Sequence, residues 1–299
     1  MTNIFQLIVF TIFCQLNIFS NANPLLGDAQ KRLKTVQDDK FSYVALIVNK
    51  NSKATFERHH CTGVLISKRR VLTAAKCLEG QSLTDLQVTF GSTDLNSPNH
   101  KDFNIKSKFT YKDWIRMNGN EHKKSSSDIA VIKLTQDTGI ESADLSYETN
   151  LQHPGSKVTV IGWGHALDDY TPRKPLIASL KIIKKEECVR KEVFAQFDSL
   201  FCAISVPKVV GVKGDYGAPV LDRTRKAVIG ILVEKNPKPE VYCMDQINLV
   251  LRLSDFKEFI NYAKSKSLST HKPNESAEEN AKRRRLDESS DFDPEFLED

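Results

Sequence analysis

The apolar residues in the middle of this chain form short runs instead of long helical stripes. From about residue 40 to residue 262, runs rich in Val, Ile, Leu and Phe alternate with turn residues such as Gly91, Pro154-Gly155 and Pro237. Short apolar runs bounded by Gly and Pro are typical of strands, and a long series of them indicates a barrel or a sandwich. The runs that we expect to form strands are Phe41–Val48, Cys61–Ser67, Leu86–Phe90, Asp128–Leu134, Lys157–Ile161, Leu176–Ile183, Ala227–Val233 and Ile247–Leu253.

Near residue 260 the pattern changes to a helical period. The apolar positions there are spaced i, i+3, i+4 and i+7, which places them on one face of a helix. Ser254 lies just before them and has a side chain suited to a helix N-cap. The pattern therefore predicts a short amphipathic helix that begins at Ser254, ends near Ser265 and closes the β core. Its apolar face consists of Phe256, Phe259, Ile260 and Ala263.

The first 22 residues differ from the rest because they contain no Lys, Arg, Asp or Glu. They hold an apolar run from Ile4 to Phe13, and Ser20-Asn21-Ala22 supplies small residues of the kind that a signal peptidase reads. We interpret residues 1–22 as a signal peptide that lacks the usual basic start, followed by a short N-terminal segment, 23–39. A retained membrane anchor is the alternative, but polar residues after Phe13 interrupt the apolar run.

Composition narrows the class of protein further. Hydrophobic residues make up 40% of the chain and charged residues 27%, which is ordinary for a globular protein and excludes a fully disordered chain. The net charge of +5 is too small to indicate nucleic acid as a partner, and neither a nucleic-acid module nor a phosphate-binding loop is visible.

The last part of the chain has a different composition from the middle. From residue 263 onward Asp and Glu outnumber Lys and Arg, and there is little apolar periodicity. Such a segment cannot bury enough surface to offset the entropy of ordering, so we interpret residues 265–299 as a disordered charged tail. It contains an N-x-S sequon at Asn274, a glycan acceptor in a secreted chain. An acidic end that binds a basic partner is the alternative interpretation.

Four short segments, in a fixed order, resemble the signatures of one enzyme family. The stretch from Cys61 to Cys77 reads CTGVLIS…VLTAAKC and is similar to CGGxLIS…VLTAAHC. Ser127–Leu134 (SDIAVIKL) resembles DIALLKL, Val160–Gly164 (VIGWG) resembles a GWG turn, and Gly214–Val220 (GDYGAPV) resembles GDSGGPL. These are the motifs of the trypsin/chymotrypsin-like serine proteases. The resemblance implies an all-β fold of two six-stranded antiparallel barrels with a C-terminal helix and a site in the cleft between the barrels.

The resemblance covers residues 40–264 and includes the cysteines, which disulfides can join in a secreted chain. Of the six cysteines, Cys14 would leave with the signal peptide. Cys243 lies near the family's third bridge, but Val212 holds the partner position, so we expect an unpaired Cys243, either as a buried thiol or in an intermolecular disulfide. The disulfides that the resemblance implies are Cys61–Cys77 and Cys188–Cys202.

The family's mechanism needs a serine nucleophile, a histidine base and an aspartate that orients the histidine. Carried over position by position, Lys76 replaces the histidine and Tyr216 replaces the serine, whereas Asp128 is retained. A lysine side chain carries its proton at neutral pH and cannot accept another, and a tyrosine oxygen lies well beyond the place of a serine oxygen. These changes predict a catalytically inactive homologue; a residual endopeptidase or an altered hydrolase that uses Lys76 or Tyr216 is the alternative.

Other parts of the family's machinery have changed as well. The segment before the domain contains no Ile-Val-Gly-Gly-like start. In the family, cleavage before such a start creates a new N-terminal amine that pairs with the aspartate at the position of Asp215, and we do not expect that pairing here. The floor of the specificity pocket corresponds to Val210, and Lys235 replaces a glycine at the pocket mouth. The amides of Gly214 and Tyr216 hold the positions of the oxyanion hole and, without a nucleophile, would at best bind an anion.

We expect Asp128 to be partly buried and to face Lys76. Removal of one partner from a buried ion pair typically costs about 3–5 kcal/mol because the other charge is left stranded. We therefore interpret Lys76 as a structural counter-ion for Asp128. The alternative is that the lysine extends to solvent and the aspartate pairs elsewhere.

These features favour a secreted, extracellular pseudoprotease that acts by binding another protein. The resemblance is nearest to arthropod serine protease homologues, which implies a role in an extracellular protease cascade such as melanisation and prophenoloxidase activation, or in venom or saliva. The partner would be a protease, a zymogen or an inhibitor, with no role for a membrane. No cofactor is expected, and His59-His60 lacks the carboxylates or thiolates of a metal site.

Overall fold

The computed structural model describes residues 34–35, 41–51, 59–90, 100–119, 128–162, 175–190, 199–205, 215–235 and 247–265. The chain divides into two compact units, residues 1–265 and 266–299. All the described residues lie in the first unit. Within the described residues, no helix is long and apolar enough to span a membrane.

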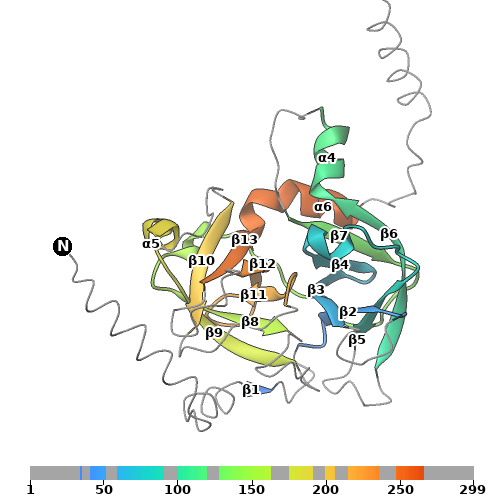
Figure 1. The fold of residues 1–299 in the computed structure, drawn as a ribbon, viewed down its shortest axis with the longest axis horizontal. Coiled ribbons are helices and arrows are strands. Elements are labelled where there is room, and N and C mark those ends of the chain that lie inside the picture. The colour runs from blue at the N-terminus through green and yellow to red at the C-terminus, as the bar shows by residue number, and fades with distance from the viewer. Residues whose placement is uncertain are drawn as a thin grey trace, which may run out of the picture. The chain divides into compact units, whose positions relative to one another are not determined.

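The first half of the unit is a closed antiparallel barrel (Figure 1). Its strands follow one another in the order β2-β3-β4-β7-β6-β5, and pairing of β2 with β5 closes the ring. The apolar side chains that drive this closure are almost fully buried, since every residue of β4 and β7 lies inside the protein. The strands are β2 (Val44–Asn49), β3 (His59–Ser67), β4 (Arg70–Thr73), β5 (Leu86–Phe90), β6 (Lys101–Thr110) and β7 (Ala130–Leu134).

The second half forms another antiparallel ring. Its strands run in the order β9-β10-β13-β12-β11-β8, and pairing of β8 with β9 closes the ring, while the two-residue strand β1 (Lys34–Thr35) adds to β9 from outside. The strands are β8 (Lys157–Gly162), β9 (Leu176–Ile182), β10 (Leu200–Ser205), β11 (Pro219–Leu221), β12 (Val228–Lys235) and β13 (Ile247–Arg252). The predicted fold, two six-stranded antiparallel barrels with a C-terminal helix, is therefore confirmed.

All the predicted strands are confirmed; Leu86–Phe90 has the predicted bounds, and the others have shifted ends. Strands β1, β4, β6, β10 and β11 were not predicted from runs of apolar residues. In β6 exposed residues lie between the buried Phe103, Ile105 and Phe109. A register shift between Ile105 and Ser107 places Phe109 on the opposite face from Ile105, where it packs on α6. A continuous apolar run is therefore absent from it, and only a period of two would have revealed the strand.

The helices differ from the prediction in two respects. Residues 253–256 form a 3-10 turn and the helix α6 (Lys257–Ser265) follows it, so Ser254 lies inside the turn and is not an N-cap. Its hydroxyl instead donates to the neighbouring Asp255. The part of the chain that the structure describes also contains two further short helices, α4 (Tyr111–Met117) and α5 (Lys185–Arg190), so the closing helix is not the only one.

The end of α6 is fixed to the first barrel, although α6 follows the last strand of the second. The ring of Phe109 on β6 stacks on Phe259 with 5.7 Å between centroids, and it lies equally close to Tyr262. Arg70 on β4 donates its Nε–H to the carbonyl oxygen of Ala263 at 3.0 Å. The helix therefore holds the two barrels together from outside, as Figure 1 shows for its position beside β6 and β7.

Candidate functional site

Lys76 lies on a 3-10 turn, Ala75–Leu78, that directly follows strand β4. The disulfide between Cys61 and Cys77 joins this turn to β3, with 6.0 Å between the Cα atoms. The second expected disulfide, Cys188–Cys202, is also present. The bond at Cys77 fixes the backbone of its neighbour Lys76, whose side chain is exposed. The position that held a histidine in the family motif is thus held rigidly at the protein surface.

Asp128 reaches the same turn from just before strand β7. Its Oδ1 accepts a hydrogen bond of 2.7 Å from the backbone N–H of Lys76. Burial raises the pKa of this carboxyl above its ordinary value, although the backbone hydrogen bonds and the positive charge of Lys76 act in the opposite direction. Burial therefore outweighs the local donors, as expected for a carboxylate removed from water without a directly bonded cation.

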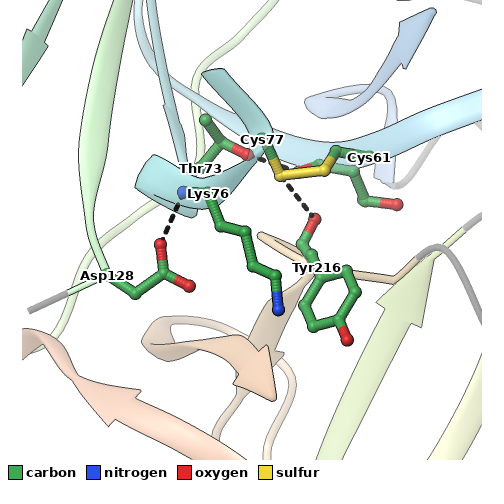
Figure 2. The surroundings of a disulfide bond; sticks show 7 residues. Cys61, Thr73, Lys76, Cys77, Asp128 and Tyr216 are labelled. Atoms are coloured by element: carbon green, nitrogen blue, oxygen red, sulfur yellow. Dashed lines mark hydrogen bonds between the residues drawn. A yellow bond between two sulfur atoms is a disulfide. The ribbon is translucent and has the colours of Figure 1, made fainter. Parts of the chain in front are cut away.

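The side chain of Lys76 points toward Tyr216 instead of Asp128 (Figure 2). Its Nζ lies over the face of the phenol ring, 4.8 Å from the ring centroid. Within the described residues, no side-chain ion pair within 4.0 Å joins Lys76 to Asp128. The predicted direct ion pair is therefore wrong, although the charge of Lys76 still acts on the carboxylate. The backbone of Lys76 satisfies the carboxylate, and its ammonium makes a cation–π contact instead.

Tyr216 lies in a tight turn before strand β11 that is anchored to the first barrel. Its carbonyl oxygen accepts a hydrogen bond from the backbone N–H of Thr62 on β3 at 2.9 Å. The Sγ of Cys77 lies 3.7 Å from the same carbonyl oxygen, and because a disulfide sulfur carries no hydrogen this is a close packing contact. Lys76, Asp128 and Tyr216 thus come together where the two barrels meet, as the motif positions predicted.

Gly217 makes this close approach of the barrels feasible. Its φ is +82°, and a Cβ there would overlap Thr62 O and Thr73 Oγ1 and lie 2.9 Å from Ala74 N. Thr73 Oγ1 in turn donates to Thr62 O at 2.8 Å, and the N–H of Gly217 donates to Leu232 O at 2.7 Å. Sequence reasoning did not identify Thr62 and Thr73 as site residues, since their role depends on backbone geometry alone.

Asp215, the residue before Tyr216, is buried against the second barrel. It is 7% exposed, and its carboxylate lies directly against the Cα of Gly162 at the end of β8, where any side chain would collide with it. Asp215 does have an interaction partner; the expected absence of the family's new amine stays a prediction. The glycine of the VIGWG segment is therefore needed for space.

The remaining predicted site residues lie outside the described residues, as do residues 1–33 and 266–299. They are Val210, Val212, Gly214, Cys243 and Asn274. Of the oxyanion-hole pair only Tyr216 is described, and in the described part of the chain its N–H makes no hydrogen bond. Among the described residues, no group of His, Cys, Asp and Glu could hold a metal ion.

Comparisons with known proteins agree with this geometry. A family model described as Trypsin matches residues 33–259. Serine protease ea of Drosophila melanogaster is 28% identical over 61% of this chain and 53% of its own length. Phenoloxidase-activating enzyme 1 of Spodoptera litura is 26% identical over 65% of this chain and 56% of its own. The chain thus spans about half the length of the curated relatives that it matches.

A solved structure supports the fold independently of sequence. Neuropsin, a serine protease of mouse brain, superimposes with a TM-score of 0.62 at 20% identity, and the match covers 78% of this chain and 99% of that one. An identity this low establishes the architecture alone. The chemistry of the site must be argued from the residues that this chain itself places there.

Proposed function

The chain belongs to the trypsin family of serine proteases, and we propose that it is a non-catalytic member that acts by binding another protein. The observation that carries this proposal is the contact of Lys76 Nζ with the ring of Tyr216, 4.8 Å from its centroid. In an active member a histidine and a serine would hold these positions and share a proton. Here a cation faces an aromatic ring, and no proton passes between them.

The surviving acid does not restore the mechanism. Asp128 would act by orienting a histidine, whereas here it accepts a hydrogen bond from the backbone of Lys76. Its carboxylate is held in place by a main-chain amide, which cannot transfer protons under ordinary conditions. A protonated lysine cannot accept the proton of a nucleophile at neutral pH. The described side chains therefore supply neither an attacking oxygen nor a base.

We further propose that the chain is secreted and works in an extracellular protease cascade. Support comes from its two disulfides, which persist in oxidising compartments, from the apolar, uncharged residues 1–22, and from relatives named for phenoloxidase activation. The partner that this role requires is a protease, a zymogen or an inhibitor, recognised by the surface of the barrels rather than by cleavage. Addition of the purified chain to insect plasma should then change the rate of phenoloxidase activation, whereas the heat-denatured chain should not.

Catalysis is tested by an attempt to restore it. We expect the double variant Lys76→His plus Tyr216→Ser to cleave no chromogenic peptide above background, because the pocket positions and the start of the domain have also changed. As a matched control, the reverse exchange in an active trypsin should abolish its activity, which shows that the assay detects the loss. Turnover by the natural chain, abolished in Lys76→Met, would refute the proposal.

A further inference from the structure

Helix α4 projects from the end of β6 and is held at its base by aromatic contacts (Figure 1). The ring of Tyr111 stacks on that of Trp114, and it meets the ring of Phe256 edge to face with 4.8 Å between the centroids. Ile115 is buried, and the backbone N–H of Tyr111 donates to the carbonyl oxygen of Ile129 at 3.1 Å. A helix this short is not stable in water by itself, so these contacts fix its position.

The opposite face of α4 carries side chains that the protein leaves uncovered. Lys112, Arg116 and Met117 are exposed, and Met117 keeps 49% of its surface in solvent. Among the described residues, Met117 is the one large hydrophobic side chain that is exposed. It follows the half-buried Trp114 by three positions, so the two side chains are neighbours on the helix, and Lys112 lies one turn before Arg116. We call Lys112, Trp114, Arg116 and Met117 the outer face of α4.

The two cations of the outer face make no direct ion pair in the described part of the chain. No acid lies within 4.0 Å of Lys112 or Arg116. Asp113 lies between them in sequence, but its carboxylate is turned back to accept hydrogen bonds from the N-cap of α4. Glu258 and Asp255 act on the phenol of the first residue of α4, at its base. Like charges one turn apart on a helix also repel each other, so a carboxylate from outside would relieve this repulsion.

We propose that the outer face of α4 is the surface through which this chain binds its protein partner, and that the partner presents there a segment with an apolar side chain between carboxylates. The apolar side chain packs on Met117 and Trp114, and the carboxylates pair with Lys112 and Arg116. Met, Trp and Arg are enriched at the centres of protein interfaces. A helix that packing already fixes also loses little entropy on binding. The inference rests on the proposed function, because it names the surface that a binding role requires.

Two labelled synthetic polymers serve as probes of this chemistry. Poly-L-glutamate offers carboxylates alone, and a random copolymer of glutamate and tyrosine adds aromatic side chains between them. The full chain is titrated with each polymer by fluorescence anisotropy. We expect it to bind the copolymer at least about fivefold more tightly than poly-L-glutamate, because an apolar contact is added to the charge pairs. Met117→Ser should remove this preference and leave the affinity for poly-L-glutamate unchanged.

The charges are tested by the double variant Lys112→Gln plus Arg116→Gln. It should bind both polymers about fivefold or more weakly, and the loss should shrink as salt screens the ion pairs. The matched control is Lys157→Gln plus Lys181→Gln, two exposed lysines that lie opposite each other on β8 and β9 of the other barrel. This control loses the same charge, and its affinities should change by less than about twofold. Equal losses in the two double variants, or equal affinity of the natural chain for the two polymers, would overturn the proposal.

A membrane is the other occupant that a basic face with exposed apolar side chains could take. If sedimented vesicles of phosphatidylcholine and phosphatidylserine carry down the natural chain but not Met117→Ser, the face is a membrane contact and the proposal is wrong. The plasma assay separates this inference from the proposed function. Unchanged activity of Met117→Ser and of the Lys112, Arg116 double variant in that assay would reject the surface and leave the binding role intact. A natural chain without effect on plasma would reject the cascade role, whereas the polymer titrations would still decide the surface.

Discussion

Gly217 offers a sharp test of how the cleft is built, because its substitution has two separable costs. The residue follows Tyr216, and its φ of +82° lies in the region that L side chains rarely adopt. A Cβ at this position would also overlap backbone and side-chain atoms of Thr62, Thr73 and Ala74 on the first barrel. Gly80 has a similar φ of +65°, but no atom lies within 4 Å of the place that its Cβ would occupy. The Gly80→Ala variant therefore carries the first cost alone.

The magnitudes follow from these contacts. A positive φ costs an alanine about 1–2 kcal/mol, part of which is offset because the unfolded chain loses freedom as well. Gly80→Ala should therefore cost about 1 kcal/mol. Overpacking adds about 1–3 kcal/mol, and the backbone atoms around Gly217 cannot rotate away, so Gly217→Ala should cost about 3–4 kcal/mol. For a domain of this size the difference lowers Tm by about 5–10 °C relative to Gly80→Ala.

Urea unfolding, followed by circular dichroism, measures both variants against the natural chain. The ratio of the two costs is more informative than either value, because the effect of φ is common to both glycines. Equal losses for Gly217→Ala and Gly80→Ala would show that the turn bearing Tyr216 does not pack on Thr62 and Ala74. The described contact between the barrels would then be incorrect.

Further predictions concern the charges of the site and of the helix end. Burial raises the pKa of Asp128 in the folded chain. The stability that the protonated carboxyl contributes is therefore full below the unfolded pKa and is lost as pH rises through the folded pKa. In urea titrations, the stability of Asp128→Asn relative to the natural chain should therefore increase between about pH 4 and pH 7. Asp222 is expected to show the opposite trend, since the hydrogen bonds from Thr224 and nearby amides outweigh burial and lower its pKa. Asp222→Asn should therefore lose more free energy of unfolding at about pH 7 than at about pH 3. If stability changed with pH in the same direction for both variants, both pKa assignments would be contradicted. Arg70→Met should lower the free energy of unfolding by about 1–2 kcal/mol, because the loss of the hydrogen bond to Ala263 outweighs the relief of repulsion with Lys133. A stabilised variant would show that the repulsion dominates.

Continuous apolar strands and the family motifs were sufficient to predict the two barrels and the position of the cleft. The strand at Leu86–Phe90 was predicted with its observed bounds, because a short apolar run that turn residues such as Gly91 bound is typical of a strand. The helix α4 was missed since its seven residues are too few for a periodic signal. Its capping box, in which Thr110 and Asp113 bond reciprocally, is the signal that could have revealed it.

The detail of the site could not be predicted from residue types alone. Lys76 and Asp128 have opposite charges, and a pairing of their side chains was the natural expectation. The aspartate instead bonds to the main chain of Lys76, and the ammonium lies over the ring of Tyr216. A main-chain donor and an aromatic acceptor have no signature in sequence, so the arrangement depends on the local backbone path that the Cys61–Cys77 bond fixes.

As a non-catalytic family member, this chain should form no covalent intermediate with a substrate carbonyl. Intact mass spectrometry after incubation with a fluorophosphonate tests it most directly, with trypsin as the positive control. We predict no stoichiometric adduct on the purified natural chain under conditions that label trypsin completely. One adduct per chain, formed at Tyr216 and lost in Tyr216→Phe, would contradict the account.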